Sequence, residues 1–377
     1  MTFLPLVAVV GLLHAFIGWR LLPELPALWG WALGVGLVLS AVVMPLGLIG
    51  GRKFKQPWAD RLSWVGLLFM GLFSSLFVLT ALRDMLLLAA WVSNALGVDL
   101  PVQSLSSMRI LTAQITPLLA LSITGLGFVN ARRTPAVVRV NVPIAGLPPE
   151  LHGFTLAQIS DIHVGPTIKH GFLQRVVTRV NTLGVDLVAI TGDLVDGKVA
   201  DLARHVAPLA GLQSRHGTFF VTGNHEYYSG AHSWIAELRR LGLTVLMNEH
   251  VVLNELLVLA GVNDYSAHHF DPTHRSDPVR ALLGAPPDAG VRILLAHQPR
   301  SAQAAADAGF DLQLSGHTHG GQFWPWNLLV PLQQPFTAGL NRLQKLWVYT
   351  SRGTGYWGPP KRFGAPSEIT LLRLVAG

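Results

Sequence analysis

The sequence predicts a helical membrane region followed by a soluble α/β domain. Two observations lead to this fold class. Four apolar runs of about bilayer-spanning length occupy the first third of the chain, and from about Ala136 strand-like apolar runs alternate with helical patterns. We place the boundary after residue 133, which gives a membrane region of about four helices over residues 1–133 and a soluble domain over residues 134–377. We interpret the segment Ala131–Pro149 as a short linker.

The charges are unevenly divided between these regions. Residues 1–133 hold nine of the 28 Lys and Arg residues and four of the 21 Asp and Glu residues, so most of the net charge of +7 belongs to them. The soluble domain has no stripe of Lys and Arg with interleaved aromatic residues, and we therefore expect no nucleic-acid partner. The chain has no cysteine, which excludes disulfides and thiolate metal sites and leaves the redox compartment open.

The apolar runs cover about Thr2–Trp19, Leu25–Ile49, Leu62–Leu82 and Ile110–Val129. Each approaches the ~20 residues that a helix needs to cross a bilayer. No basic segment precedes the first run, which favours an uncleaved span over a signal peptide. The polar segment Ser93–Met108 is predicted to be an outer loop. We therefore expect a multi-pass integral membrane protein.

Basic residues indicate the orientation of these spans. They gather between the second and third runs and after the fourth, at Arg52, Lys53, Lys55, Arg61, Arg132 and Arg133. Cytoplasmic loops carry such an excess, so both termini and the soluble domain are expected in the cytoplasm. Arg83 and Asp84, at the end of the third run, are interpreted as interfacial residues rather than as a functional site in the membrane.

Five polar strings stand where apolar runs of the soluble domain end. They are Ser160–His163, Gly192–Asp196, Gly223–Glu226, Ala296–Gln298 and Gly316–His319. Chemistry in α/β sheets collects beyond the carboxyl ends of the strands. Carboxylate, amide and imidazole donors without thiolate suit Mn²⁺, Fe, Zn²⁺ or Mg²⁺. The strings therefore predict a site for two divalent metal ions.

Individual residue types refine this prediction. Asp161 and His163 are separated by one residue and can face the same ion, while the carboxylate of Asp193 has enough lone pairs to bridge two ions. Asn224 adds an oxygen donor without a charge that would repel a phosphate. Nitrogen donors come from His297, His317 and His319.

In the order D-x-H, G-D-x-x-D, G-N-H-[DE], a lone H and G-H-x-H, these strings resemble the calcineurin-like metallophosphoesterase superfamily. The resemblance covers about residues 150–377 and implies a four-layer α/β/β/α sandwich. It implies that one metal is held by Asp161, His163, Asp193 and His319, and the other by Asp193, Asn224, His297 and His317.

Longer strings narrow the resemblance to the YkuE-like branch and to transmembrane proteins with a metallophosphoesterase domain. They are Ile159–Gly165, Gly316–Gln322 and Ser351–Gly355. An N-terminal membrane segment is frequent in that branch, which agrees with the first third of this chain. Its substrates are diverse.

These observations predict a membrane-anchored phosphoesterase that cleaves a phosphodiester, pyrophosphate or phosphomonoester bond. Two divalent ions would activate a water molecule for in-line attack on phosphorus, and His225 would stabilise the transition state or protonate the leaving oxygen. Asp196 either supports the site or caps a turn. A lipid-linked substrate fits the membrane anchor, and a soluble nucleotide or a phosphoprotein stays open.

Two other functions compete with hydrolysis. One is a non-catalytic membrane scaffold or sensor that uses metal only for folding, against which His225 argues. The other is a transporter regulated by a phosphoesterase-like domain, against which the scarcity of intramembrane charge argues.

Several other residues are left without a role or with two readings. No role is assigned to His152, His170, His205, His216, His232 and His250. His268 and His269 lie in the polar stretch Asn263–Arg275, which is an ordinary connection or a substrate loop. The aromatic run Phe323–Pro331 is either core or an exposed surface for a bilayer or an acyl chain.

Overall fold

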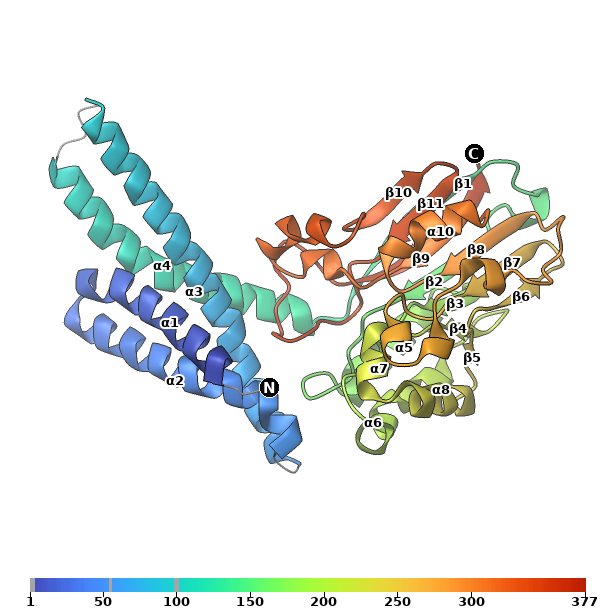
Figure 1. The fold of residues 1–377 in the computed structure, drawn as a ribbon, viewed down its shortest axis with the longest axis horizontal. Coiled ribbons are helices and arrows are strands. Elements are labelled where there is room, and N and C mark those ends of the chain that lie inside the picture. Colours follow the sequence, from blue (N-terminus) through green and yellow to red (C-terminus); the bar gives the residue numbers. More distant parts are fainter. Residues whose placement is uncertain (1–3, 54–55, 98–101) are drawn as a thin grey trace. The chain divides into compact units, whose positions relative to one another are not determined.

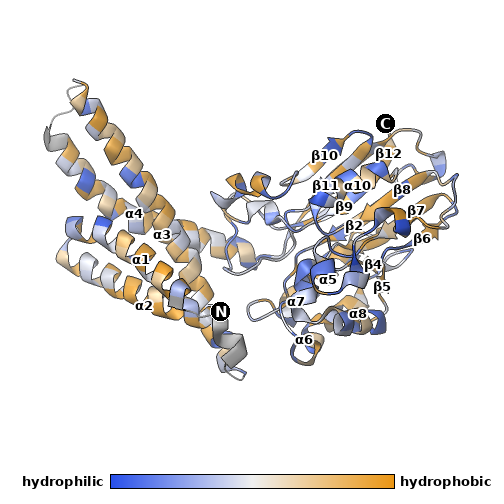
Figure 2. Cartoon of the chain, viewed as in Figure 1, coloured by the Kyte–Doolittle hydropathy of each residue, from blue (hydrophilic) through white to orange (hydrophobic). Residues whose placement is uncertain are grey.

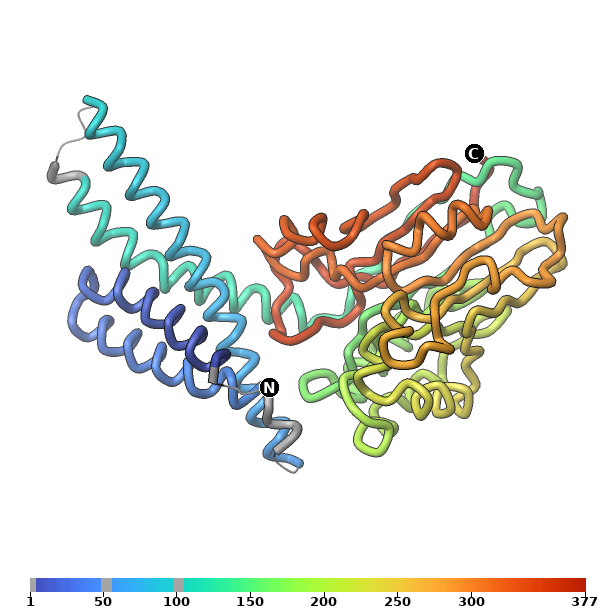
Figure 3. Tube along the Cα trace, viewed as in Figure 1, coloured from blue at the N-terminus to red at the C-terminus, as the bar shows by residue number. Residues whose placement is uncertain are grey.

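The computed structural model describes residues 4–53, 56–97 and 102–377 (Figure 1). The chain divides into two compact units. The helical unit contains Met1–Val129 and Gly358–Lys361. The second unit contains Asn130–Trp357 and Arg362–Gly377 and is named the catalytic unit after the function that its polar strings predict. Figure 3 shows the path of the chain through both.

The helical unit consists of long apolar helices, which carry mostly the orange of hydrophobic residues in Figure 2. They are α1 (Leu4–Leu21), α2 (Ala27–Lys53), α3 (Trp58–Ala95) and α4 (Val102–Arg132), with the short turn η1 (Leu22–Glu24) between the first two. Within the described residues, these four helices are long and apolar enough to cross a membrane. Of the basic residues used to predict orientation, Lys55 lies outside the described residues, and only the helical backbone of Arg52 and Lys53 is described.

The prediction of a loop over Ser93–Met108 is wrong for most of that segment. Helix α3 continues to Ala95, and α4 already begins at Val102, while residues 98–101 lie outside the described part. Polarity alone was a poor guide here, because a polar residue on a helix surface does not end the helix. The described backbone leaves the α3 helix just before Gly97, whose φ of 84° is accessible to glycine.

Close backbone packing and ion pairs hold the helical unit together. A Cβ atom on Gly47 would lie 2.7 Å from Cα of Gly66, so α2 and α3 meet through small residues, as helices in membranes commonly do. Charged side chains are also paired: Arg20 Nε lies 2.8 Å from Asp84 Oδ2, and Arg109 lies 2.7 Å from Glu24. Buried Arg83 donates to the Thr112 hydroxyl and to Asp84.

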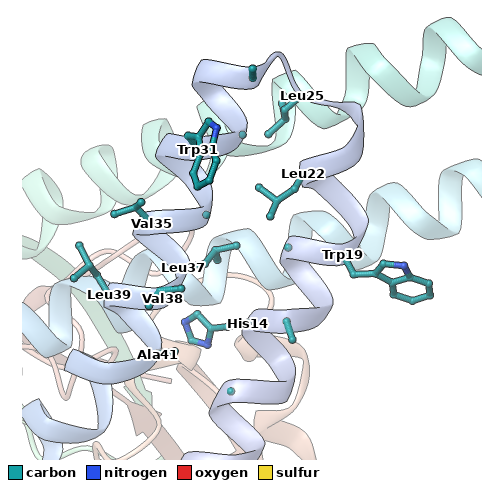
Figure 4. A pocket seen from close by; sticks show the side chains of 16 residues that line it. His14, Trp19, Leu22, Leu25, Trp31, Val35, Leu37, Val38, Leu39 and Ala41 are labelled. Carbon is teal, nitrogen blue, oxygen red and sulfur yellow. The ribbon is translucent and has the colours of Figure 1, made fainter.

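A groove of about 860 Å³ runs along α1 and α2 (Figure 4). Its lining is mainly apolar and includes Leu22, Trp31 and Val38. His14 is the titratable residue in the lining, and its ring nitrogens are bonded to the Val10 carbonyl and the Ser40 hydroxyl. None of the predicted metal-binding residues lines this groove.

The catalytic unit is built on two six-stranded mixed sheets (Figure 1). In spatial order the first sheet contains β1 (Ala136–Ile144), β12 (Glu368–Ala376), β2 (Thr155–Ile159), β3 (Leu187–Ile190), β4 (Thr218–Phe220) and β5 (Thr244–Val245). The second contains β10 (Gly339–Leu343), β11 (Leu346–Thr350), β9 (Leu312–Ser315), β8 (Val291–Leu295), β7 (Leu257–Gly261) and β6 (Glu249–Leu253).

Helices complete this unit. They are α5 (His170–Asn181), α6 (Val199–Val206), α7 (Asn224–Ser229), α8 (Ala231–Arg240), α9 (Pro278–Ala281) and α10 (Ala302–Asp307). The short 3₁₀ turns are η2 (Pro149–Leu151), η3 (Ala207–Gly211), η4 (Ala267–His269), η5 (Pro272–His274), η6 (Pro299–Ser301), η7 (His319–Gly321), η8 (Trp326–Leu328) and η9 (Val330–Leu332).

Three hydrophobic clusters show that these elements form four layers. One cluster packs α5, α6 and α8 against the first sheet, with Trp234 fully buried in it. A second fills the space between the sheets and includes Leu156 and Leu314. The third packs α10 against the second sheet. The predicted α/β/β/α sandwich is thereby confirmed, with four apolar helices before it.

Strand β1 corrects the interpretation of Ala131–Pro149 as a linker. Residues 138–144 alternate between valine or isoleucine and other residues, a strand signal that the linker interpretation overlooked. β1 is an edge strand that pairs in parallel with β12, with Ala136 opposite Glu368. Because β12 is antiparallel to β2, Ala136 lies at the edge of the sheet where β2 ends. Arg132 is held close by, donating to the Thr167 carbonyl and the Tyr356 hydroxyl.

Candidate metal centre

All seven predicted metal-binding residues follow strands of the two central sheets. Asp161 and His163 come after β2, Asp193 after β3, Asn224 after β4, His297 after β8, and His317 and His319 after β9. Strands β2, β3 and β4 are parallel neighbours, as are β8 and β9, so their carboxyl ends meet at one edge. The sandwich thus brings together segments up to 158 residues apart in the chain.

One group of donor atoms consists of Asp161, His163 and His319. Nε2 of His163 lies 3.1 Å from Nε2 of His319, and Nε2 of His319 lies 3.5 Å from Oδ1 of Asp161. The three ligand atoms all lie within 4.8 Å of one another and are buried. Two imidazole nitrogens facing each other at this distance are arranged as they would be around a shared ion.

A second group adjoins it and consists of Asp193, His297 and His317. Oδ2 of Asp193 lies 3.2 Å from Nε2 of His297, which lies 3.2 Å from Nδ1 of His317. The same Oδ2 is 3.9 Å from Nε2 of His163 in the first group. The carboxylate of Asp193 therefore stands between both groups, as a bridging ligand must.

The side-chain oxygen of Asn224 indicates whether metal ions fit among these residues. This oxygen is buried and, within the described part of the chain, has no hydrogen-bond partner. A buried acceptor without a partner costs about 1–3 kcal/mol, which a bound cation would relieve. The donor set, with oxygen and imidazole ligands and no thiolate, suits borderline or hard divalent ions. The residues thus fit the two-metal site.

Two of the predicted histidine ligands are neutral in this environment, whereas at His297 burial is outweighed by the carboxylates of Asp193 and Asp161, which hold the pKa of the ring well above its ordinary value. Burial lowers the pKa of His317 to about 3, with His297 contributing in the same direction. Burial and the guanidinium of Arg362 hold the pKa of His319 well below its ordinary value. Both rings are therefore neutral at physiological pH, as metal ligation requires.

The backbone of the ligand loops is unusual. Five of the seven residues have positive φ, between 50° and 69°, in the left-handed region: Asp161, His163, Asp193, His317 and His319. The loops also have no room for side chains at two glycines. A Cβ atom on Gly223 would collide with Oδ1 of Asp193, and one on Gly316 would collide with Oδ2 of Asp161. This crowding explains the glycines that precede Asn224 and His317.

Glu226 contributes to the site in a way that the sequence interpretation missed. Its buried carboxylate accepts hydrogen bonds from four backbone N–H groups, those of Asp193, Leu194, Val195 and Gly223, at 2.6–3.3 Å. It thereby joins the loop after β3 to the start of α7. The G-N-H-[DE] string contains Glu226, but nothing in the sequence shows that its partners are backbone groups about thirty residues earlier.

Asp196 supports the site rather than only capping a turn. Its Oδ1 lies 3.0 Å from Nδ1 of His163 and 2.6 Å from Nδ1 of His225. Bonding Nδ1 of His163 directs Nε2 of that ring towards the first group, which is how carboxylates orient ligating histidines. His297 is oriented similarly, because its Nδ1 lies 2.7 Å from the Thr191 carbonyl.

Arg362 is another residue that the sequence interpretation missed. It is fully buried, and its guanidinium donates to the carbonyls of His319, Arg352 and Gly355 and lies 3.0 Å from Nδ1 of His319. It follows the tail string Ser351–Gly355 by seven residues, outside every motif. Its contacts show that it holds the loop of His319 against the segment after β11.

Exposed aromatic side chains lie beside His225, and further exposed apolar side chains follow the loop of His319 in the chain. The rings of Tyr228 and Trp357, which are 62% and 55% exposed, lie 5.1 Å and 5.9 Å from the ring of His225. In the run Phe323–Pro331, Phe323 is buried. The exposed large residues of the run are Trp324, Trp326, Leu328 and Leu329, and Leu332, which follows the run, is exposed as well. Of the two readings of this run, the exposed one holds for most of it.

His268 and His269 are not among the converging ligand atoms of the described residues. They lie in η4, and Nδ1 of His268 is 3.2 Å from the Tyr265 carbonyl. The structure therefore does not bring them into the candidate centre.

Replacing Glu226 by Gln should weaken the framework of the site. The amide has one acceptor oxygen and would place N–H donors against the backbone N–H groups that Glu226 now binds. We expect the free energy of unfolding to fall by about 1–3 kcal/mol and divalent-metal affinity to fall with it. Chemical denaturation and metal analysis measure both. The exposed Glu150 gives the control Glu150→Gln, and equal stability and metal content in both variants would contradict this role.

Comparison with known proteins identifies the family. The profile of the calcineurin-like phosphoesterases matches residues 154–321. A bovine transmembrane protein with metallophosphoesterase domain is 40% identical over 316 residues, which cover 80% of this chain and 70% of the relative. The corresponding zebrafish protein is 41% identical over 68% of this chain and 62% of its own length. The uncharacterized metallophosphoesterase YkuE of Bacillus subtilis is 30% identical over 60% of this chain and 81% of its own. The chain therefore belongs to the calcineurin-like metallophosphoesterases, a family of metal-dependent phosphoesterases.

Proposed function

We propose that this protein is a membrane-anchored phosphoesterase with a two-metal centre held by Asp161, His163, Asp193, Asn224, His297, His317 and His319. The observation that carries the proposal is the position of Asp193 between the two donor groups, with its Oδ2 within 4 Å of a nitrogen from each. Family membership supports phosphoester hydrolysis, and the choice among diester, pyrophosphate and monoester stays open.

Two divalent ions in this centre would supply positive charge for the phosphoryl oxygens and lower the pKa of a water molecule. The protein side chains keep the local charge suited to an anionic substrate. Two carboxylates, Asp161 and Asp193, would balance part of the charge of two dications, and the imidazole and amide donors would bind the ions as neutral groups. A phosphate therefore meets a net positive centre. No nucleophilic side chain is required.

His225 is proposed as the acid that assists the leaving oxygen. Burial opposes its charged form, but the hydrogen bond to Asp196 and the nearby Asp193 carboxylate outweigh burial and raise the pKa of His225 to about 9. The bond to Asp196 engages Nδ1, which leaves Nε2 directed towards the site, 4.0 Å from Oδ2 of Asp193. A proton on Nε2 can stabilise the developing oxyanion or pass to the leaving group.

This pairing also argues against a non-catalytic scaffold. A purely structural metal site gains nothing from an additional imidazole that is held by a shared carboxylate and remains 15% exposed at the open side. A site of hydrolysis needs such a group.

A substrate in or on the membrane is favoured by two features of the catalytic unit. The chain enters this unit at the sheet edge where β2 ends, which is also the edge of the candidate metal centre. Exposed apolar side chains, among them Trp324 and Leu332, follow the loop of His319. Such a surface can hold acyl chains while the phosphoester reaches the centre. We propose a lipid-linked phosphoester as the substrate class.

The activity is tested by purifying the full chain in detergent with Mn²⁺. We expect hydrolysis of an aryl phosphodiester or monoester, its loss on chelation, and its return with Mn²⁺. Asp193→Asn should lower turnover by at least roughly two orders of magnitude, because the bridging carboxylate positions both ions.

A lipid-linked phosphoester and a short-chain analogue of the same headgroup separate the substrate classes. Faster turnover of the lipid supports the membrane substrate, and equal turnover favours a soluble one. A metal-loaded protein without activity on any ester would leave the scaffold as the function. Wild-type activity with two bound metals in Asp193→Asn would refute the bridging role.

His225→Ala should behave differently from the ligand variant. We expect turnover to fall while the metal content stays nearly unchanged, because His225 is assigned to the transition state and not to the ions. Elemental analysis beside steady-state kinetics makes the distinction. Loss of one ion in this variant would place His225 among the ligands.

The orientation in the membrane is also a proposal. Basic residues at the end of α2, at the start of α3 and at the end of α4 support a multi-pass protein with the catalytic unit in the cytoplasm. In bacterial cells, a fluorescent reporter fused after Gly377 should be bright and a periplasmic phosphatase reporter silent. The opposite pattern would place the catalytic unit on the outer face and require an odd number of spans.

A further inference from the structure

His232, Asp271 and His274 form a second cluster of ligand-type side chains, outside the candidate metal centre. His232 lies in the first turn of α8, Asp271 immediately precedes the short turn η5, and His274 is the last residue of that turn. One ligand atom from each residue lies within 4.8 Å of the other two. The sequence interpretation assigned no role to His232, because nothing in the sequence connects it with residues about forty positions later.

The distances in this cluster fit a tetrahedral ion. Nε2 of His232 lies 3.1 Å from Oδ2 of Asp271, and Nε2 of His274 lies 3.9 Å from the same oxygen. Ligand atoms bound at about 2.0 Å in tetrahedral geometry are about 3.3 Å apart. The two measured separations bracket that value, so small side-chain movements would complete the coordination.

In Asp271 and His274, the atoms that face away from the position of such an ion already form hydrogen bonds. Oδ1 of Asp271 accepts hydrogen bonds from the backbone N–H and the hydroxyl of Thr273, which leaves Oδ2 available. Nδ1 of His274 lies 2.9 Å from the hydroxyl of Tyr227, which leaves Nε2 available. Ligating histidines commonly use their second nitrogen in this way, because the partner fixes the tautomer and the ring orientation.

An ordinary ion pair explains this arrangement less well. One protonated imidazole is enough to neutralise Asp271, yet two imidazole rings with centroids 4.9 Å apart face the same oxygen. If both were protonated, they would repel each other. Two neutral imidazoles and one carboxylate are a donor set for a cation of the zinc class.

We propose that His232, Asp271 and His274 bind a divalent cation of the zinc class at an additional site, separate from the catalytic ions. The site is accessible, since the His232 side chain is 75% exposed and those of Asp271 and His274 are 25% and 15% exposed. Three protein ligands leave a fourth position for solvent. The ion would link α8 to the segment that carries η4 and η5.

The site also has a structural connection to the candidate centre. The hydroxyl of Tyr227, which contacts His274, belongs to α7, the helix that begins with Asn224 and His225. The hydroxyl of Thr222, just before Gly223, lies 3.5 Å from the Tyr227 hydroxyl. Occupation of the additional site would therefore stabilise one side of α7 without contributing a ligand to the catalytic ions.

Zinc titration of the full chain tests the proposal. After chelation, the detergent-solubilised protein is titrated with Zn²⁺ in competition with a chromophoric chelator. We expect one more bound equivalent in the wild-type chain than in His232→Ala, with affinity for that equivalent reduced at least about tenfold in the variant. His232 is exposed, so this substitution should not prevent folding. His269→Ala, in neighbouring η4, is the matched control and should bind zinc as the wild type does.

Two further measurements separate this site from the catalytic centre. In an Asp193→Asn background, the His232-dependent equivalent should persist. Zinc should also raise the unfolding temperature more in the wild-type chain than in His232→Ala, because an ion that binds the folded state stabilises it. Equal zinc stoichiometry in wild type and His232→Ala, or the same loss in His269→Ala, would overturn the proposal. Neither measurement depends on phosphoesterase activity.

Discussion

The candidate centre depends on one buried carboxylate that is not itself among the proposed ligands. Glu226 accepts four backbone hydrogen bonds and fixes two loops relative to each other, the loop of Asp193 and the turn at Gly223. Burial and the neighbouring Asp193 carboxylate raise the pKa of Glu226 to about 7, and in its ionised form the residue makes charge-assisted bonds, which are stronger than neutral ones. With the loops held in this way, Asp193 faces both donor groups, and Asn224 begins its helix at the right place.

These hydrogen bonds are needed because the loops that carry the predicted metal-binding residues adopt unfavourable backbone conformations. Left-handed backbone at a residue other than glycine costs about 1–3 kcal/mol, and five ligand residues adopt it. Their side chains can then converge from opposite sheets onto a small volume. The surrounding hydrogen bonds, from Glu226, Asp196 and Arg362, oppose relaxation of these loops. The rigid strands of the two sheets fix the positions at which these loops begin.

The sequence was sufficient to predict which residues converge at the candidate centre, because each one follows an apolar strand within a short, ordered string. The four-layer fold was predicted only from the resemblance to the metallophosphoesterase superfamily. The alternation of strands and helices along the chain does not show how two sheets face each other. Glu226, Arg362 and His274 escaped prediction for a shared reason. Each acts on groups distant in the chain, and residue type alone does not reveal such partners. The edge strand β1 escaped because its position after a membrane helix favoured the interpretation as a linker.

The place of β12 in the first sheet has a consequence for biosynthesis. This strand is the last of the catalytic unit in chain order, yet it lies between β1 and β2 and pairs with both. The sheet therefore cannot close while residues 368–376 are still within the ribosome. Domains otherwise tend to fold from the N-terminus as the chain emerges. Until β12 is inserted, the edges of β1 and β2 that pair with it have no partner strand. The nascent catalytic unit then exposes strand edges that a chaperone would have to cover.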